Sequence, residues 1–189
     1  MTTSRPQLTI DVLMAELMAL AQISEAEPPV VTRVVFGEAD MRARAYVKGL
    51  CEAAGLKVHE DAIGNTFARW EGSDPALAPV GTGSHIDAIP NAGLYDGCVG
   101  VLGGLEAIRV LKKLGFKPRR SIELVIFTAE EPTRFGIGCL GSRMMADVLT
   151  PKQALALRDK EGRGLEEWRT QAGFEIGRAS CRERVSIDV

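Results

Sequence analysis

Residues 80–128 read VGTGSHIDAIPNAGLYDGCVGVLGGLEAIRVLKKLGFKPRRSIELVIFT, and this stretch decides the fold. Residues 80–84 predict a short strand that ends at His85, and residues 98–114 predict a helix. Residues 121–128 give the strongest strand signal of the chain, apolar on both faces and therefore typical of a central strand. The succession of strand, helix and strand predicts an α/β protein.

The predicted helix over residues 98–114 contains several small residues, namely Gly100, Gly103, Gly104 and Ala107. Small side chains let a helix lie close to a sheet, at a cost in helix propensity that packing must offset. We therefore expect this helix to pack directly on the predicted strands.

Further elements are predicted on both sides of this stretch. Residues 9–23 and 38–54 predict amphipathic helices, and residues 56–60 and 66–70 predict two strands joined by a turn at Gly64-Asn65. Thr150-Pro151 predicts the start of a polar helix.

The two amphipathic helices each have a predicted inward face. In the first helix we expect this face to consist of Leu13, Leu17 and Leu20, widened by Ile10, Met14 and Met18, with Thr9 or Asp11 as the cap. In the second we expect Met41, Ala45 and Leu50 inward and Arg42, Arg44 and Lys48 outward.

Chemically capable side chains follow the predicted strands. His85 follows one strand, Glu130-Glu131 follows another, and Asp96 opens the helix between them. Open α/β sheets place their ligands just after the strands, so we expect the three segments to converge on one sheet edge.

These residue types suit a metal-dependent hydrolase. His85 can ligate a metal through neutral imidazole, and Asp87, two residues further along an extended segment, can hold the proton of the other ring nitrogen. Asp96 can bridge two metal ions about 3.5–4 Å apart. Of Glu130 and Glu131, one can ligate a metal while the other takes a proton from water and delivers it to a leaving nitrogen.

Each motif alone has a structural explanation. His85 with Asp87 is typical of a surface pair, Asp96-Gly97 of a turn, and Glu130-Glu131 of a helix start. Their conjunction at strand ends favours a metal site. We interpret His59 as solvated, and Cys98 and Cys139 as core residues without a histidine partner.

Composition excludes several classes of protein. The chain has 189 residues, enough for one domain, and its formal net charge of −2 gives no electrostatic case for nucleic-acid binding. No apolar run reaches the length of a membrane span, and the N-terminus lacks an apolar signal core, so we expect a cytoplasmic protein. The 4 cysteines form no CxxC pair, which indicates reduced thiols.

Residues 83–108 (GSHIDAIPNAGLYDGCVGVLGGLEAI) and 127–143 (FTAEEPTRFGIGCLGSR) resemble the M20 family of metallo-amidohydrolases. The resemblance runs from about Leu8 to about Ala146. It is closest to the branch of ureidoglycolate amidohydrolase, allantoate amidohydrolase and N-carbamoyl-L-amino-acid hydrolase. The motifs are more specific to the family than to the substrate.

The resemblance implies an incomplete zinc-peptidase-like catalytic domain of the α/β class, with a mixed sheet and flanking helices. It implies two divalent metal ions, Mn²⁺ or Zn²⁺, with His85, Asp96 and Glu131 as ligands. It further implies Glu130 as general acid/base and Asp87 as the support of His85. The implied reaction is hydrolysis of a linear, non-peptide C–N bond of a ureido or carbamoyl acid, as in allantoin catabolism, by a homodimer.

The chain departs from the family pattern in two ways. Members of the family have further metal-binding histidines after the glutamate pair, whereas this chain has no histidine after His85. The smaller lid domain, which contributes to substrate recognition and to the dimer contact, is also missing. We therefore expect residues 1–174 to be the N-terminal part of a catalytic domain.

Residues 175–185 read EIGRASCRERV, which resembles the translation of a sequencing adaptor. We expect residues 175–189 to be a non-native tail, so that Cys181 has no functional role. The alternative is a genuine Arg-rich tail.

Two hypotheses of different classes follow. In the first, the parent protein is an amidohydrolase of ureidoglycolate or allantoate, with a carbamoyl amino acid as the second candidate and a peptide as the third. In the second, the 189-residue chain is an inactive fragment, because three ligands are few for two metal ions. The substrate and the choice between Mn²⁺ and Zn²⁺ stay open.

Overall fold

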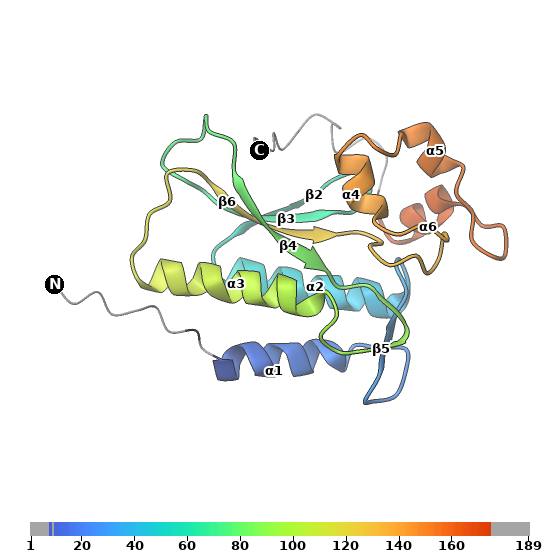
Figure 1. The fold of residues 1–189 in the computed structure, drawn as a ribbon, viewed down its shortest axis with the longest axis horizontal. Helices are drawn as coiled ribbons and strands as arrows, with labels where there is room; N and C mark the ends of the chain where they lie inside the picture. Colours follow the sequence, from blue (N-terminus) through green and yellow to red (C-terminus); the bar gives the residue numbers. More distant parts are fainter. Residues whose placement is uncertain (1–7, 9, 175–189) are drawn as a thin grey trace.

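A four-stranded mixed sheet forms the centre of the computed structural model, which describes Leu8 and residues 10–174 (Figure 1). Its strands are β2 (Lys57–Glu60), β3 (Thr66–Trp70), β4 (Val80–His85) and β6 (Ile122–Phe127), in the order β2-β3-β6-β4. β3 pairs antiparallel with β2 and β6, whereas β4 runs parallel to β6. The predictions of an α/β fold, a mixed sheet and a central position for β6 are confirmed.

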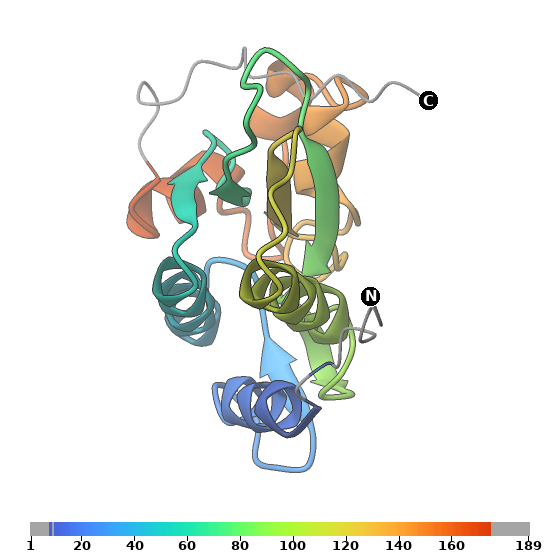
Figure 2. The ribbon, with the colours of Figure 1, turned by 90° about the vertical axis from the view of Figure 1, so that its left-hand side faces the viewer.

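Helices cover both faces of this sheet. α2 (Glu38–Ala53) and α3 (Cys98–Lys113) lie on one face, and α1 (Ile10–Ala21) lies on the side of these helices away from the sheet (Figures 1 and 2). α4 (Leu140–Met145) and α5 (Pro151–Leu155) lie on the opposite side, followed by α6 (Leu165–Gln171). Thr150 caps α5 with a capping box, as Thr150-Pro151 predicted. Within the described residues, no helix is both long and apolar enough to cross a bilayer.

α3 packs on β4 and β6 through two of its glycines. A Cβ atom at Gly100 would lie 2.7 Å from the Cβ of Ser84, and one at Gly104 would lie 2.9 Å from Cδ1 of Leu124. The predicted close packing is therefore confirmed at these two positions. A Cβ at Gly103 would meet open space, and Ala107 is exposed, so neither contributes to it.

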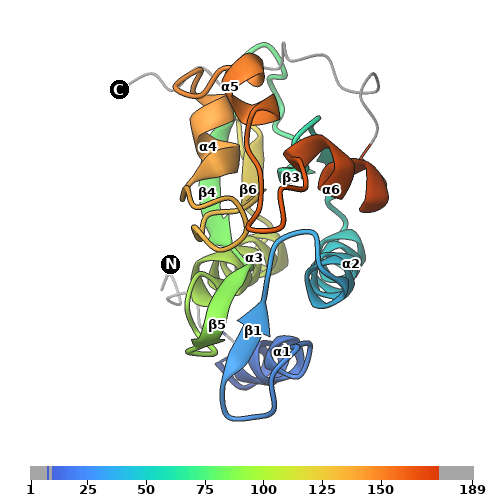
Figure 3. The same cartoon turned by 90° about the vertical axis from the view of Figure 1, so that its right-hand side faces the viewer.

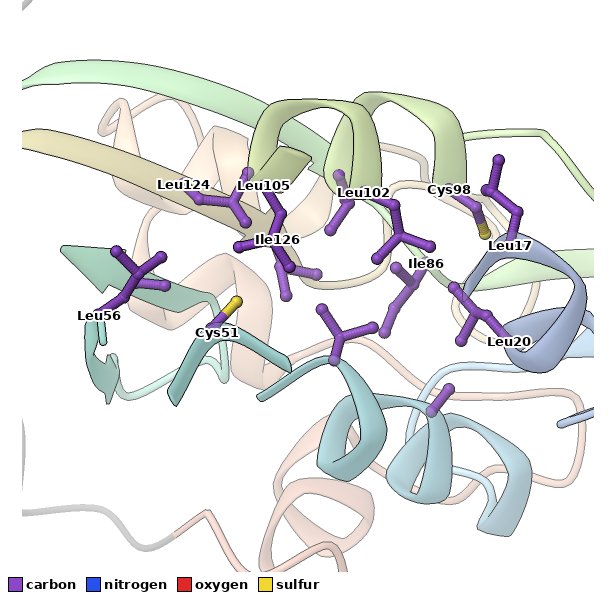
Figure 4. Close-up of a cluster of buried hydrophobic side chains, with 14 of the residues drawn as sticks. Leu17, Leu20, Cys51, Leu56, Ile86, Cys98, Leu102, Leu105, Leu124 and Ile126 are labelled. Atoms are coloured by element: carbon purple, nitrogen blue, oxygen red, sulfur yellow. The ribbon is translucent and has the colours of Figure 1, made fainter. Parts of the chain in front are cut away.

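The main core lies between the sheet and α1, α2 and α3, where leucine, isoleucine and cysteine side chains meet (Figure 4). Leu17 and Leu20 of α1 are buried in it. The prediction that the apolar face of this helix also includes further residues is wrong, because Ile10, Met14 and Met18 are exposed. Because α1 forms an outer layer, its neighbours cover only a narrow stripe of its surface. The proposed cap Thr9 lies outside the described residues.

A second sheet has two antiparallel strands, β1 (Val31–Arg33) and β5 (Ala88–Ala92), which lie side by side next to α1 (Figure 3). The sequence did not predict either strand, nor α4 and α6. β5 contains Pro90 and Asn91, residues that are depleted in strands, and β1 has only 3 residues.

The inward face of α2 differs from the predicted one. Ala43, Val47 and Cys51 form the buried stripe, and Ala45 is exposed. Arg44, predicted to point outward, is 2 % exposed.

Burial of Arg44 is accommodated by an ion pair within α2. Its Nε donates to Oδ2 of Asp40 at 3.0 Å, and Asp40 itself is fully buried. The guanidinium also donates to the carbonyl of Gly64 at 2.7 Å and to Oγ1 of Thr128 at 3.2 Å. Arg44 thus links α2 to the turn before β3 and to the end of β6.

Asp40→Asn removes the charge that neutralises Arg44 and keeps the shape of the side chain. We expect the free energy of unfolding to fall by about 3–5 kcal/mol, because a buried guanidinium is left without its counter-charge. Urea unfolding followed by circular dichroism measures the change. The control Lys48→Met breaks the ion pair between Lys48 and Glu60, whose side chains are 33 % and 25 % exposed. It should cost less than about 1 kcal/mol, and equal losses in the two variants would contradict the prediction.

Candidate metal site

The candidate site lies at the carboxyl ends of the parallel strands β4 and β6. His85 ends β4 and pairs with Phe127, which ends β6. Glu130 and Glu131 follow β6 after Ala129, a residue in the left-handed region with φ 51°. The structure therefore brings the segments that follow both strands to one sheet edge.

His85 lies close to three of the carboxylates singled out in the sequence. Nε2 of His85 is 3.4 Å from Oε2 of Glu130 and 3.8 Å from Oδ1 of Asp96. His85, Glu130 and Glu131 each offer a ligand atom, and these atoms lie within 4.8 Å of one another. The side chain of His85 is 8 % exposed, that of Glu130 36 % and that of Asp96 59 %, so the cluster opens to solvent on the carboxylate side.

His85 is oriented by the backbone of Asp87. Nδ1 of His85 lies 2.9 Å from the carbonyl oxygen of Asp87 and 3.7 Å from its Oδ1. The hydrogen bond that the sequence reasoning gave to the carboxylate is therefore made by the carbonyl. A carbonyl oxygen can only accept a hydrogen bond, so Nδ1 is the donor and carries the proton, and in the neutral ring Nε2 presents its lone pair to Glu130 and Asp96.

The carboxylate of Asp87 serves the loop after β6 instead. Its Oδ1 accepts from the backbone N–H of Glu130 at 3.3 Å, and its Oδ2 accepts from that of Glu131 at 3.1 Å. Asp87 is 1 % exposed. This buried side chain therefore joins the end of β4 to the glutamate pair.

Burial and charge shift the acidity of two carboxyl groups here. Desolvation raises the pKa of Asp87 to about 6, and the charge of Asp40 acts in the same direction. Desolvation also raises the pKa of Glu131; His85 opposes this rise when its ring is protonated, and the charges of Glu130 and Asp96 add to it. Carboxylates that repel one another beside an imidazole lone pair gain stability when a cation binds between them.

The donor set fits one divalent cation. One imidazole nitrogen with two or three carboxylates is a ligand set that suits Zn²⁺ and Mn²⁺ alike. Gly97, with φ 63°, permits the approach of the chain before α3, because a Cβ there would lie 2.5 Å from Nε2 of His85. The Asp96-Gly97 pair is therefore a turn that also places a carboxylate beside the histidine.

Two buried residues that hold the site were missed by the sequence reasoning. Arg33 is fully buried and donates to the carbonyl of Ile86 at 2.6 Å and to that of Leu20 at 2.7 Å. Asn65 accepts from the N–H of Thr128 through Oδ1 at 2.8 Å. Arginine and a turn asparagine usually lie at the surface, so residue type gave no signal.

The cysteines differ from one another in their environment. Cys98 is buried, as expected, and burial raises the pKa of its thiol. Cys139 is half-buried and its Sγ donates to Oε1 of Glu130 at 3.3 Å. This hydrogen bond raises the pKa of the Cys139 thiol. His59 lies exposed on β2, where its ring stacks on Phe67.

Residues 65–160, which include this whole cluster, match the family model described as peptidase family M28. The chain belongs to this family. The resemblance noted in the sequence, to M20 metallo-amidohydrolases of ureidoglycolate, allantoate and N-carbamoyl-L-amino acids, is confirmed, because relatives and solved structures with these names match the chain.

This member of family M28 is similar to several relatives over most of its own length. It is 57 % identical over 136 residues to ureidoglycolate hydrolase of Oryza sativa subsp. japonica, an overlap of 72 % of this chain and 28 % of the relative. It is 41 % identical over 166 residues to N-carbamoyl-L-amino acid amidohydrolase of Geobacillus stearothermophilus, covering 88 % and 40 %. It is 34 % identical over 168 residues to allantoate amidohydrolase of Bacillus subtilis, covering 89 % and 41 %.

A solved structure confirms the fold of this member of family M28. The crystal structure of AtUAH in complex with glyoxylate superposes with a TM-score of 0.87 at 47 % identity, covering 93 % of this chain and 42 % of that one. The chain therefore spans less than half of the length of each of these proteins.

Asp87→Asn should change how stability depends on pH in the metal-free protein. Because the folded chain binds the Asp87 proton more tightly than the unfolded chain, Asp87 contributes most stability below about pH 4, and this contribution is lost as the pH rises through about 6. As the pH rises between these two values, the free energy of unfolding should fall less in Asp87→Asn than in the parent protein. Urea unfolding in EDTA measures this.

Asp11→Asn, which removes an exposed carboxyl of α1, is the control for that pH series. It should keep the slope of the parent. An unchanged slope in Asp87→Asn would show that the Asp87 carboxyl is ionised over the whole range.

His85→Ala should weaken metal binding. Loss of the imidazole removes the sole nitrogen that the described cluster offers to a metal, so we expect the dissociation constant for Mn²⁺ or Zn²⁺ to rise at least about tenfold, measured by isothermal titration calorimetry. His59→Ala, on the exposed face of β2, should leave it unchanged. Equal affinity in both variants would place the metal elsewhere.

Proposed function

We propose that this chain supplies the metal-binding part of the active site of an amidohydrolase that cleaves a linear C–N amide bond of a ureido or carbamoyl acid. The observation that carries the proposal is the convergence of His85, Asp96, Glu130 and Glu131 at the ends of β4 and β6. A chain with this site belongs to family M28 and is similar to hydrolases named for such substrates.

Nε2 of His85 and the carboxylates of Asp96 and Glu131 would hold Mn²⁺ or Zn²⁺, and the second carboxylate oxygen of Asp96 would be available to a second ion. When bound, the metal would act as a Lewis acid that polarises the substrate carbonyl and lowers the pKa of water. The set of described ligands is small for two ions. The second ion would therefore depend on ligands from the rest of a longer protein, in which residues 1–174 form the N-terminal part of the catalytic domain.

Glu130 would act as the general base. In this role its carboxylate takes a proton from the attacking water as the C–O bond forms at the carbonyl carbon. It then gives that proton to the leaving nitrogen as the C–N bond breaks, so that the nitrogen departs as ammonia. The distance of 3.4 Å between Oε2 of Glu130 and Nε2 of His85 supports this role, because a base must lie near the metal that His85 would bind.

Glu130 and Glu131 have different proposed roles, as base and as metal ligand, which an experiment can distinguish. Both carboxylates reach the ligand cluster, and the assignment of Glu131 as ligand and Glu130 as base follows the family resemblance. Hydrogen bonds to the buried carboxylate of Asp87 fix the backbone N–H of both glutamates, so their side chains start from adjacent, defined positions.

Ureidoglycolate is the first candidate substrate and allantoate the second member of the same class. The relative with 57 % identity is named for ureidoglycolate, which favours it. An N-carbamoyl-L-amino acid is a second candidate function, favoured by the relative with 41 % identity. We further propose a cytoplasmic homodimer with a lid domain outside the 189 residues, and no catalysis by the 189-residue chain alone.

Ammonia release tests this function. The Mn²⁺-loaded protein that contains this chain is assayed with ureidoglycolate, allantoate and N-carbamoyl amino acids, and the 189-residue chain is assayed beside it. Release from a ureido acid supports the proposal, and preference for a carbamoyl amino acid selects the second candidate. Absence of release from all of them in the metal-loaded protein overturns the proposal.

Glu130→Gln should lower kcat by roughly 100-fold or more, because an amide cannot accept the proton of water. The dissociation constant for the metal should stay near that of the parent, since Glu130 is the base and not a ligand. Glu131→Gln is the matched variant and should raise that constant at least about tenfold. If the two variants exchange these phenotypes, then the roles of the two glutamates are reversed.

A further inference from the structure

We propose that Cys139 is a positioning residue for Glu130: its thiol donates to Oε1 and thereby holds Oε2 toward His85. The inference rests on the proposed function in one respect, namely that Glu130 is the general base. No family or relative name assigns a role to this cysteine.

The two oxygens of Glu130 have different partners. Oε1 accepts from Sγ of Cys139 at 3.3 Å, and Oε2 lies 3.4 Å from Nε2 of His85. The last torsion of a glutamate side chain is broad and two-fold, so an unheld carboxylate rotates freely. A donor fixed on one oxygen therefore sets the plane of the carboxylate and the direction of the other oxygen.

The backbone places the thiol opposite Glu130. The N–H of Cys139 donates to the carbonyl of Glu130 at 2.7 Å, and the N–H groups of Leu140 and Gly141 donate to Ala129 and Thr128, each at 2.9 Å. These successive bonds hold residues 128–130 and 139–141 against each other. The contact of the two side chains thus follows from paired backbone segments.

Cys139 occupies a backbone conformation that its own β-carbon disfavours. It has φ 58° and ψ 32°, the left-handed region, as the residue before α4. Glycine or asparagine fits this region with less strain. A cysteine here pays a conformational cost that glycine avoids, and the contact with Glu130 is what its side chain adds.

The thiol has the chemistry that a positioning donor needs. The carboxylate of Glu130 raises the pKa of Cys139, which keeps the sulfur protonated near neutral pH. A thiol is a weak donor, so it orients Glu130 without strongly lowering its basicity. Within Leu8 and residues 10–174, Cys139 is the hydrogen-bond donor to this carboxylate, beside the contact with His85.

Variants at Cys139 test the proposal in the metal-loaded protein that contains this chain. We expect Cys139→Ala to lower kcat roughly tenfold with KM little changed, because the base is misoriented in the transition state while substrate binding is retained. Cys139→Ser keeps a donor and should restore most of the loss. Cys51→Ala removes a thiol buried in the core and should keep the parental kcat.

A second readout needs no activity. In the metal-free 189-residue chain, Glu130→Gln should raise the alkylation rate of Cys139 by iodoacetamide at pH 8 about threefold or more, because removing the carboxylate lowers the thiol pKa. Mass spectrometry of peptides resolves each cysteine. Cys51 and Cys98, both buried, are internal standards and should not change.

The outcomes separate this inference from the proposed function. A Cys139 alkylation rate that does not respond to Glu130→Gln overturns the inference, as does parental kcat in Cys139→Ala or a Cys139→Ser variant no better than alanine. If the parent protein hydrolyses no ureido or carbamoyl acid, the proposed function fails. The alkylation result then decides by itself whether Cys139 holds Glu130.

Discussion

The buried carboxylate of Asp87 is the interaction on which the candidate site depends. It connects two segments that are more than 40 residues apart in sequence, because it accepts hydrogen bonds from the backbone N–H groups of Glu130 and Glu131. The backbone carbonyl of the same residue, Asp87, orients His85. Parallel pairing of β4 and β6 brings the segments near each other. Asp87 fixes their spacing at the level of a hydrogen bond, at the cost of a carboxylate in a desolvated position.

Two buried arginines reinforce this connection from opposite sides. Arg33 donates to the carbonyl of Ile86, the residue between His85 and Asp87, and also to the carbonyl of Leu20 in the last turn of α1, where the helix dipole is negative. Arg44 binds Thr128 at the end of β6 and is neutralised by Asp40. Among the described residues, the hydrogen bonds of these two arginines reach none of the carboxylates of Asp96, Glu130 and Glu131, so the arginines support the chain around the candidate site.

Sequence reasoning succeeded where a pattern is long and carried by side chains. β3 was predicted at Thr66–Trp70 and found there, and the apolar run of residues 121–128 correctly predicted the central strand. It failed where the deciding partners are distant: Arg44 was placed outward because a helix pattern cannot show that Gly64 and Thr128 will receive it. β1 and β5 stabilise each other by backbone pairing that leaves no periodic signature.

The same division explains which parts of the site were visible in the sequence. His85, Asp96 and the glutamate pair are recognisable because imidazole and carboxylate side chains are themselves the groups that suit a metal site. Their supports act largely through backbone atoms: the carbonyl of Asp87, the N–H groups of residues 130 and 131, and the carbonyl of Ile86. Any residue offers such atoms, so their role depends on the path of the chain. The reactive groups can thus be found from residue type, whereas the geometry that orients them is a property of the folded chain.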